Sequence, residues 1–151
     1  MALIEARQLS LLRGGREVLR DVSFGAEANE TLVLIGPSGS GKSSLLRCLN
    51  RLEEPARGTV FLHGEDITTL PVVMLRRRVG MVFQHPAMFP GTVAENIAYG
   101  PALRGDPLPP DRMAALLEMV MLDPALAERP ANELSGGQAQ RVAVARALAN
   151  E

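Results

Sequence analysis

The sequence has few of the residues that would indicate an oxidising compartment or a nucleic-acid partner. Its single cysteine, Cys48, excludes a disulfide within the chain and fits a reducing compartment. Tryptophan is absent and aromatic residues make up only 3% of the chain, so side chains on which nucleic-acid bases stack are scarce. The 16 basic and 17 acidic residues give a net charge of -1. Without a basic excess, no nucleic-acid partner is expected.

Long apolar runs are also missing. No apolar run approaches the length of a membrane span, and the first residues do not resemble a signal peptide. We therefore expect a soluble protein that reaches a membrane only through another protein. Hydrophobic residues make up 46% of the 151 residues, which is enough for the core of one domain.

One glycine-rich stretch fits the phosphate-binding pattern G-x-x-x-x-G-K-[ST]. Its residues are Gly36, Pro37, Ser38, Gly39, Ser40, Gly41, Lys42 and Ser43. The short β-branched run 31–35 before it predicts a buried strand, and leucines at helical spacing predict a helix from Lys42 to about Arg51. Because strand, loop and helix come in the required order, we predict a nucleotide site rather than a glycine turn that matches by chance.

The residue types of this loop explain how it would hold a triphosphate. Glycines let successive backbone N–H groups point at the phosphates, and the beginning of the helix adds the positive end of its dipole. Lys42 is expected to reach the outer phosphates, and the Ser43 hydroxyl is placed to ligate Mg²⁺.

The remaining first half of the chain predicts further strands and a short helix. The strands cover residues 3–11, 18–24, 59–62 and 79–83. Gly14-Gly15 joins the first two as an antiparallel hairpin. Val72 to Arg78 predicts a helix whose arginines form a solvated end, or alternatively contact a partner or a phosphate. Gln84 follows the last strand, at the edge where ligands bind in a doubly wound fold.

The composition of the sequence changes between His85 and Glu133, which we interpret as an inserted helical subdomain. Its first part contains several prolines and glycines. Apolar residues from Met113 to Met121 then predict an amphipathic helix, with Asp111 as N-cap and the methionines filling the core. This subdomain is the candidate region for contact with a partner.

A second glycine-containing helix start lies near the end of the chain, at Leu134-Ser135-Gly136-Gly137-Gln138. Ser135 is a suitable N-cap, and Gly136 and Gly137 leave the N–H groups of the first turn uncovered. The stretch therefore predicts a second anion-binding helix start, and the alternative is a plain glycine-rich cap.

Taken together, the phosphate-binding loop, Val82-Phe83-Gln84 and Leu134 to Gln138 followed by residues 139–147 strongly resemble an ABC-type ATPase, the nucleotide-binding subunit of ABC transporters. The resemblance covers essentially the whole chain and implies an α/β fold. A P-loop NTPase core would carry an N-terminal antiparallel β hairpin and an inserted helical subdomain. The implied parts are the core with the antiparallel strands (1–84), the helical subdomain (85–134) and the signature helix (135–151).

The resemblance also implies roles for the matching residues. Gly36 to Ser44 would bind ATP, with Lys42 and Gln84 as catalytic residues and Ser43 and Gln84 as Mg²⁺ ligands. The signature residues would contact the γ-phosphate of ATP held by a second ATP-binding subunit in a head-to-tail dimer; they are Ser135, Gly136, Gly137 and Gln138. The segment from His85 to Ile97 would dock a transmembrane permease, so the protein is expected in the cytoplasm at the inner face of the membrane.

Two departures from the family pattern affect these expectations. No aromatic residue lies near Leu12 to Gly15 to stack on adenine, and the guanidinium plane of Arg13 is the alternative. The chain also stops at Glu151, before the Walker B strand and aspartate, the catalytic glutamate and the switch histidine that the family places later. We therefore expect a truncated domain of marginal stability that binds ATP but hydrolyses it poorly.

The kind of ABC protein is less strongly specified. Residues 128–133 look more like those of importer-type subunits, which favours an importer. Two alternatives stay open. One is a soluble ABC-family ATPase acting on nucleic acid or ribosomes, although the chain has neither a basic face nor a coiled-coil insertion. The other is a non-catalytic nucleotide-binding fragment.

Overall fold

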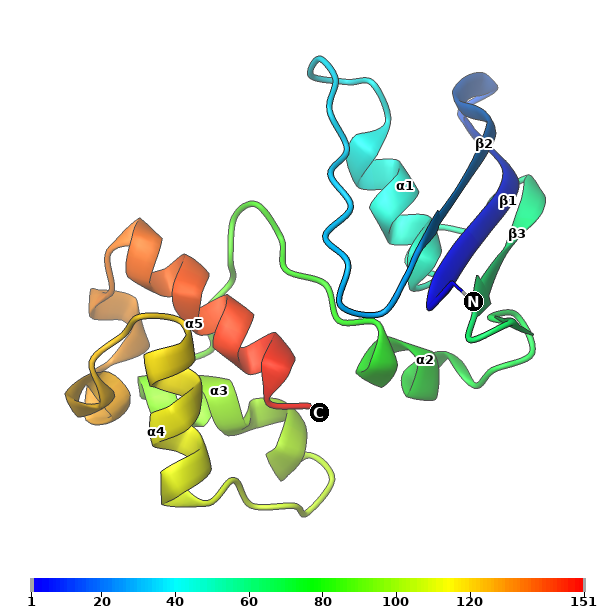
Figure 1. Cartoon of the computed structure of the whole chain (residues 1–151). Helices are drawn as coiled ribbons and strands as arrows, with labels where there is room; N and C mark the ends of the chain where they lie inside the picture. The colour runs from blue at the N-terminus through cyan, green and yellow to red at the C-terminus, as the bar shows by residue number, and fades with distance from the viewer. Residues whose placement is uncertain (1, 151) are drawn as a thin grey trace. The chain divides into compact units, whose positions relative to one another are not determined.

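A computed structural model describes residues 2–150, which form two compact units, one ending at Val79 and the other starting at Gly80 (Figure 1). The first unit carries the phosphate-binding loop, and the second carries Gln84 and the signature residues. No helix within residues 2–150 is long and apolar enough to cross a membrane.

The first unit is a four-stranded antiparallel sheet with two helices. Its elements in chain order are β1 (Ile4–Arg13), β2 (Arg16–Ala26), α1 (Lys42–Leu49), β3 (Arg57–Leu62), β4 (Glu65–Asp66) and α2 (Val72–Arg78). The sheet order is β2-β1-β3-β4. Three of the five predicted strands, 3–11, 18–24 and 59–62, and both predicted helices of this unit are confirmed, with α1 ending slightly earlier than expected.

The predicted hairpin between β1 and β2 is also confirmed. Arg13 pairs with Arg16 across a two-residue turn, and both turn residues, Gly14 and Gly15, have positive φ (56° and 77°). A two-residue hairpin turn with positive φ at both positions matches the right-handed twist of the strands, and glycine adopts it without steric cost. The hairpin thereby brings Arg13 to the end of the sheet at a defined position.

The core of the first unit lies between the sheet and α1. Leu9 of β1, Val60 of β3 and Cys48 of α1 are at most 2% exposed and belong to one cluster of buried side chains. Burial of each large aliphatic side chain contributes roughly 1.5–3 kcal/mol. This packing fixes α1, and with it the residues at its beginning, against the sheet.

Cys48 is expected to be inert while the first unit is folded. Burial, followed by the charges of Glu53 and Glu54, raises the pKa of its thiol to about 11. The neutral thiol is thus favoured by folding, and this stabilisation, present below the ordinary thiol pKa, is lost as the pH rises toward 11. At pH 8 we expect a disulfide reagent to react at least about 100-fold more slowly than with an exposed cysteine. Absorbance of the released thiolate, with and without denaturant, measures this; equal rates would contradict the buried position.

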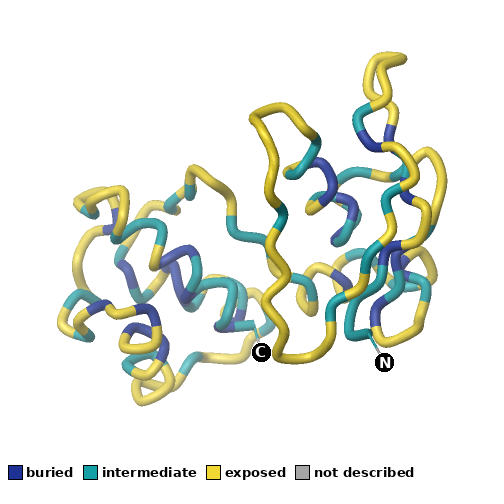
Figure 2. The backbone as a smooth tube through the Cα atoms, turned by 45° about the horizontal axis from the view of Figure 1, so that its top comes forward, coloured by how far each residue is buried: buried dark blue, intermediate teal, exposed yellow. Residues whose placement is uncertain are grey.

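The predicted strand over residues 31–35 is wrong. The chain between β2 and α1 runs beside α1 without regular structure (Figure 1), and residues 27–33 are exposed (Figure 2). Val33 and Ile35 are 67% and 93% exposed, while Leu34 packs against the core. A strand forms only where its backbone groups pair with a neighbouring strand, and none of the described strands pairs with this segment.

The predicted strand over residues 79–83 is wrong for the same reason. These residues follow α2 as an irregular segment, so Gln84 lies in a loop and not at the end of a strand. Both segments have a composition that favours a strand, but the described chain supplies no strand to pair with either of them.

The second unit consists of three helices and two short 3-10 turns. They are α3 (Val93–Ala102), α4 (Pro110–Met119), the turns Pro124–Glu128 and Ala131–Glu133, and α5 (Gly136–Leu148). Ile97, Leu116 and Val142, one from each helix, are fully buried in a common core. The amphipathic helix predicted after His85 is therefore confirmed as α4.

Two details predicted for this helix are wrong. Its N-cap position is Pro109 and not Asp111, because Pro110 provides a preset φ for the first helical residue. Asp111 instead lies in the first turn, where its charge complements the helix dipole. Met121 is 76% exposed rather than in the core, since α4 ends at Met119 and Met121 has a φ of 56°.

Candidate functional site

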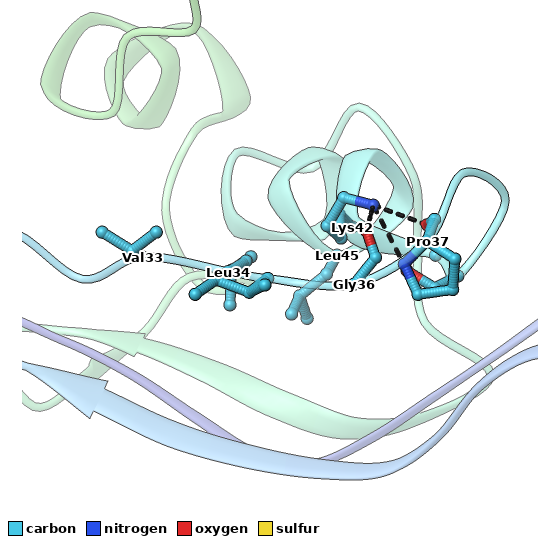
Figure 3. A pocket seen from close by; sticks show the side chains of 9 residues that line it. Val33, Leu34, Gly36, Pro37, Lys42 and Leu45 are labelled. Carbon is cyan, nitrogen blue, oxygen red and sulfur yellow. Dashed lines mark hydrogen bonds between the residues drawn. The ribbon is translucent and has the colours of Figure 1, made fainter.

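The phosphate-binding loop closes around the ammonium group of Lys42, the first residue of α1. Its Nζ donates hydrogen bonds to the backbone oxygens of Gly36 at 2.8 Å and Pro37 at 2.7 Å (Figure 3). A longer contact of 3.4 Å reaches Ser40 Oγ. The lysine is therefore held inside the curve of the loop by the residues that form it.

Gly41 permits this loop to enter the helix. It occupies the N-cap position of α1 with φ 91°, where no side chain caps the helix. A Cβ atom at Gly41 would lie 2.8 Å from the backbone oxygen of Val18 and 2.9 Å from Leu19 Cδ2. Conformation and space thus both require glycine, since a side chain would have to displace the backbone of β2.

The first N–H groups of α1 have no acceptor within the helix. This holds for any α-helix, and here they belong to Lys42, Ser43 and Ser44. No acidic residue occupies the first turn. The positive end of the helix dipole therefore adds to the charge of Lys42, which is the arrangement that favours an anion.

A cavity of about 360 Å³ lies beside the loop (Figure 3). Its lining is apolar on one side and consists of the loop and the beginning of α1 on the other. The lining residues are Val33, Leu34, Ile35, Gly36, Pro37, Ser40, Gly41, Lys42 and Leu45. None of them is acidic and the only charged one is Lys42, so the cavity attracts a compact anion.

The residues expected to ligate Mg²⁺ lie in different units. Ser43, at the second position of α1, and Gln84 are both exposed. A hydroxyl and an amide oxygen are ligands that Mg²⁺ accepts, and this ion usually keeps several waters and substrate phosphate oxygens. Ser43 therefore fits as a partial ligand of a nucleotide-bound Mg²⁺. Within the described residues no cluster of histidine, cysteine or carboxylate side chains forms a site for a metal by itself.

Arg13 reaches the same end of α1 from the hairpin. Its Nη2 donates to Ser44 Oγ at 3.3 Å and forms an ion pair with Glu53. The structure thus places Arg13 beside Ser44 of α1 and shows an ion-pair partner, Glu53, that the sequence did not predict. Nothing in the local sequence around Glu53 indicates this contact, because 40 residues separate the two side chains.

The signature residues form the predicted helix start in the second unit. Ser135 is the N-cap of α5: its Oγ accepts from Gln138 N–H at 3.3 Å, and Gln138 Oε1 accepts from Ser135 N–H at 3.0 Å. This capping box occupies both side chains as backbone acceptors. A Cβ atom at Gly136 or Gly137 would meet no atom within 4 Å. The first turn of α5, to which both glycines belong, is therefore open to an approaching group.

The segment predicted to dock a partner is anchored by two residues that sequence reasoning missed, Asn96 and Arg146. Asn96, fully buried in α3, accepts from Phe89 N–H and donates to the backbone oxygens of Phe89 and Thr92. Arg146 of α5 donates to Asn96 Oδ1 and to the Ala87 oxygen. Burial lowers the pKa of the Arg146 guanidinium below its usual value, although it remains charged. An asparagine among the apolar residues of α3 was the available sequence signal.

An aromatic pair joins the same anchored segment to the following turn of α3. Phe89 and Tyr99 stack with ring centroids 4.1 Å apart, and the Arg146 guanidinium lies 4.9 Å from the Phe89 centroid. Both rings remain about 40% exposed. The pair therefore presents a rigid, half-apolar surface of the kind enriched in protein interfaces.

Comparisons with family models, curated proteins and solved structures all indicate the same family. The family model for the ABC transporter matches residues 19–151. Protein STAR1 of Oryza sativa subsp. japonica is 57% identical over 137 residues, which cover 91% of this chain and 40% of that protein. ABC transporter I family member 17 of Arabidopsis thaliana is 54% identical over 137 residues, covering 91% of this chain and 52% of that protein. The chain thus spans about half the length of the curated relatives it matches.

Bacterial relatives and solved structures point the same way. The methionine import ATP-binding protein MetN of Caulobacter vibrioides is 47% identical over 143 residues, 91% of this chain and 43% of that protein. The structure of CbiO1 from Clostridium perfringens, part of the ABC transporter complex CbiONQ, superposes with a TM-score of 0.84 at 25% identity, covering 99% of this chain and 62% of that one. A bacterial Atm1-family ABC exporter with ATP bound gives 0.83 at 30% identity, covering 98% and 27%.

Proposed function

Because the chain belongs to the ABC transporter family, we propose that it is an ATP-binding part of an ABC transporter that holds MgATP on Gly36 to Ser44. The observation that carries the proposal is the position of Lys42, whose ammonium is fixed inside the loop by the Gly36 and Pro37 oxygens. A fixed cation beside the unpaired N–H groups of a helix start binds a phosphate chain with little reorganisation.

Each part of the loop contributes a separate interaction. Lys42 keeps its position through the loop oxygens and offers its charge to the outer phosphates. The backbone N–H groups of Ser43 and Ser44 would donate to phosphate oxygens, and the Ser43 hydroxyl would be an Mg²⁺ ligand. When bound, Mg²⁺ supplies charge neutralisation of the phosphates.

The second anion-binding helix start suggests a composite site between two subunits. In the capping box Ser135 Oγ accepts from Gln138 N–H, so its own hydrogen remains available to donate. The N–H groups of Gly136 and Gly137 extend this donor set at the beginning of α5. We propose that these groups contact the γ-phosphate of ATP on a second ATP-binding subunit arranged head to tail, so that ATP holds the pair together.

Turnover by these 151 residues alone is proposed to be slow. Phosphoryl transfer requires a positioned water as well as a cradle for the phosphates. None of the described residues that line the cavity beside the loop is acidic, so none of them would orient a water through a carboxylate. ATP binding without efficient hydrolysis is the expected behaviour.

We propose a transmembrane permease as the partner of the segment from His85 to Ile97, which places the protein at the cytoplasmic face of a membrane. The half-exposed aromatic pair Phe89 and Tyr99 and the network of Asn96 and Arg146 behind it support this choice. The relative named as a methionine import ATP-binding protein supports an importer.

The proposal is tested by comparing MgATP with MgAMP in calorimetric titrations of the full chain. If the loop recognises the outer phosphates, we expect MgATP to bind at least about 100-fold more tightly, corresponding to roughly 3 kcal/mol. Both ligands carry the same base and ribose, so the comparison isolates the β- and γ-phosphates. Equal affinities would reject the loop as a triphosphate site.

A further inference from the structure

Three charged side chains, Arg13, Arg47 and Glu53, connect the turn end of the hairpin with α1 and the residues after it. Arg13, the last residue of β1, forms an ion pair with Glu53 through Nη2 and Oε1, and Nη2 also donates to Ser44 Oγ at 3.3 Å. Arg47 of α1 donates to the same Glu53 oxygen at 3.3 Å. One carboxylate oxygen therefore holds two guanidinium groups, and Glu53 determines where Arg13 points.

The environment of Glu53 is suited to positioning a cation. Its side chain is 18% exposed, against 57% for Arg13. Its second oxygen, Oε2, is buried and has no hydrogen-bond partner in the part of the chain that the structure describes. A carboxylate withdrawn from water in this way depends on its two cations to offset the lost hydration, so this ion pair is held more firmly than one at an open surface.

Arg13 still has donors to offer. Both of its contacts use Nη2, which leaves Nε and Nη1 of an exposed guanidinium outside them. Ser44 is the third residue of α1, directly after Lys42 and Ser43. Because Ser44 Oγ accepts from Arg13, its own hydrogen is left to donate to another group.

We propose that Arg13 is a specificity residue for the phosphate chain of the nucleotide and that Glu53 is its positioning residue, an inference that rests on the proposed function. Held beside Ser44, the guanidinium adds positive charge where the triphosphate meets α1. The same contacts keep it from lying flat on the base. Nucleotide recognition by this chain then depends on the phosphates more than on the base.

Inorganic tripolyphosphate has the phosphates without base or sugar. It therefore distinguishes an Arg13 that contacts the phosphates from an Arg13 that contacts the base. We expect Arg13→Gln to lower the affinity for Mg-tripolyphosphate and for MgATP by the same factor, about five- to tenfold. Arg16→Gln is the matched control: it removes an equal charge from the residue paired with Arg13 across the hairpin, and a change under about twofold is expected. Arg13→Lys keeps a cation but loses the planar fork, and an intermediate loss is expected.

Glu53 is tested by a double-mutant cycle. If it positions Arg13, the effect of Arg13→Gln on tripolyphosphate affinity falls to under about twofold in a Glu53→Gln background. Thermal unfolding of each variant verifies that the chain is folded. A Glu53 with only a structural role would change the melting temperature but leave the factor for Arg13→Gln unaltered.

The remaining outcomes are equally decisive. If Arg13→Gln weakens MgATP alone and leaves tripolyphosphate unchanged, Arg13 contacts the base and the inference is overturned. If it behaves like Arg16→Gln toward both ligands, Arg13 has no role in binding and the inference is overturned as well. A wild-type chain that binds neither ligand would instead reject the proposed function itself.

Discussion

Replacing Lys42 with alanine is expected to weaken MgATP binding about 100-fold or more while changing the unfolding temperature by less than about 3 °C. The ammonium makes two short hydrogen bonds to the loop and carries the only charge in the cavity. Losing a fixed cation that contacts phosphates costs roughly 3 kcal/mol of binding, whereas its bonds to an exposed loop contribute little to folding. Calorimetric titration and a thermal melt of both proteins provide the measurements.

The composition of the chain supplies an independent way to follow this residue. Lys42 is the only lysine, since every other one of the 16 basic residues is arginine. An amine-reactive acetylating reagent therefore modifies Lys42 and the α-amino group alone, and mass spectrometry resolves the two. MgATP is expected to slow acetylation of Lys42 about tenfold or more at saturation, and MgAMP much less. If MgATP left the acetylation rate of Lys42 unchanged, the nucleotide would have to bind elsewhere.

The structure also explains why position 42 requires lysine rather than arginine. The compact ammonium fits between the Gly36 and Pro37 oxygens, whereas the planar guanidinium of arginine is larger and requires a fork of acceptors. Lys42→Arg is therefore expected to lose most of the binding although it keeps the charge. If Lys42→Arg binds like the wild type, charge alone and not position would explain the site.

The parts of the site that the sequence predicted well are those that depend on local contacts. The loop, the beginning of α1 and the N-cap at Ser135 each involve residues within about six positions of one another. The hairpin is equally local, because two glycines in succession select its turn. Such features follow from residue type and spacing, and the structure confirms them.

The features that the sequence did not predict depend on distant partners. The β-branched run 31–35 indicates a preference for a strand, but that preference is realised only when a neighbouring strand pairs with it, and none of the described strands does. Glu53 and Arg13 are 40 positions apart, and Asn96 and Arg146 are 50 apart. Composition and periodicity contain no information about which distant polar groups meet, so these contacts had to come from the structure.

Asn96 provides the second large expected effect. We expect Asn96→Ala to destabilise the second unit by about 2–4 kcal/mol and to lower its unfolding midpoint by at least about 8 °C. The fully buried side chain satisfies the N–H and oxygen of Phe89 and donates to the oxygen of Thr92. Removing it takes this partner from the Phe89 N–H and oxygen, whereas the Thr92 oxygen keeps the backbone N–H of residue 96. A polar group left without a partner costs more than its hydrogen bond contributes.

Hydrogen exchange measured at individual amides distinguishes this mechanism from a general loss of packing. The amide of Phe89 is expected to exchange much faster in Asn96→Ala, since its acceptor is Asn96 Oδ1. Asn132→Ala is the matched control, because Asn132 is exposed and the same atoms are removed; a change within about 0.5 kcal/mol is expected there.

Arg146 loses one of its two acceptors when Asn96 is shortened but keeps the Ala87 oxygen. The segment from His85 to Ile97 would therefore loosen around Phe89 before α5 is affected, and uniform exchange across the unit would contradict this order. If the aromatic pair there docks a permease, the same variant should weaken that association more than it weakens MgATP binding, because the loop around Lys42 belongs to the other unit.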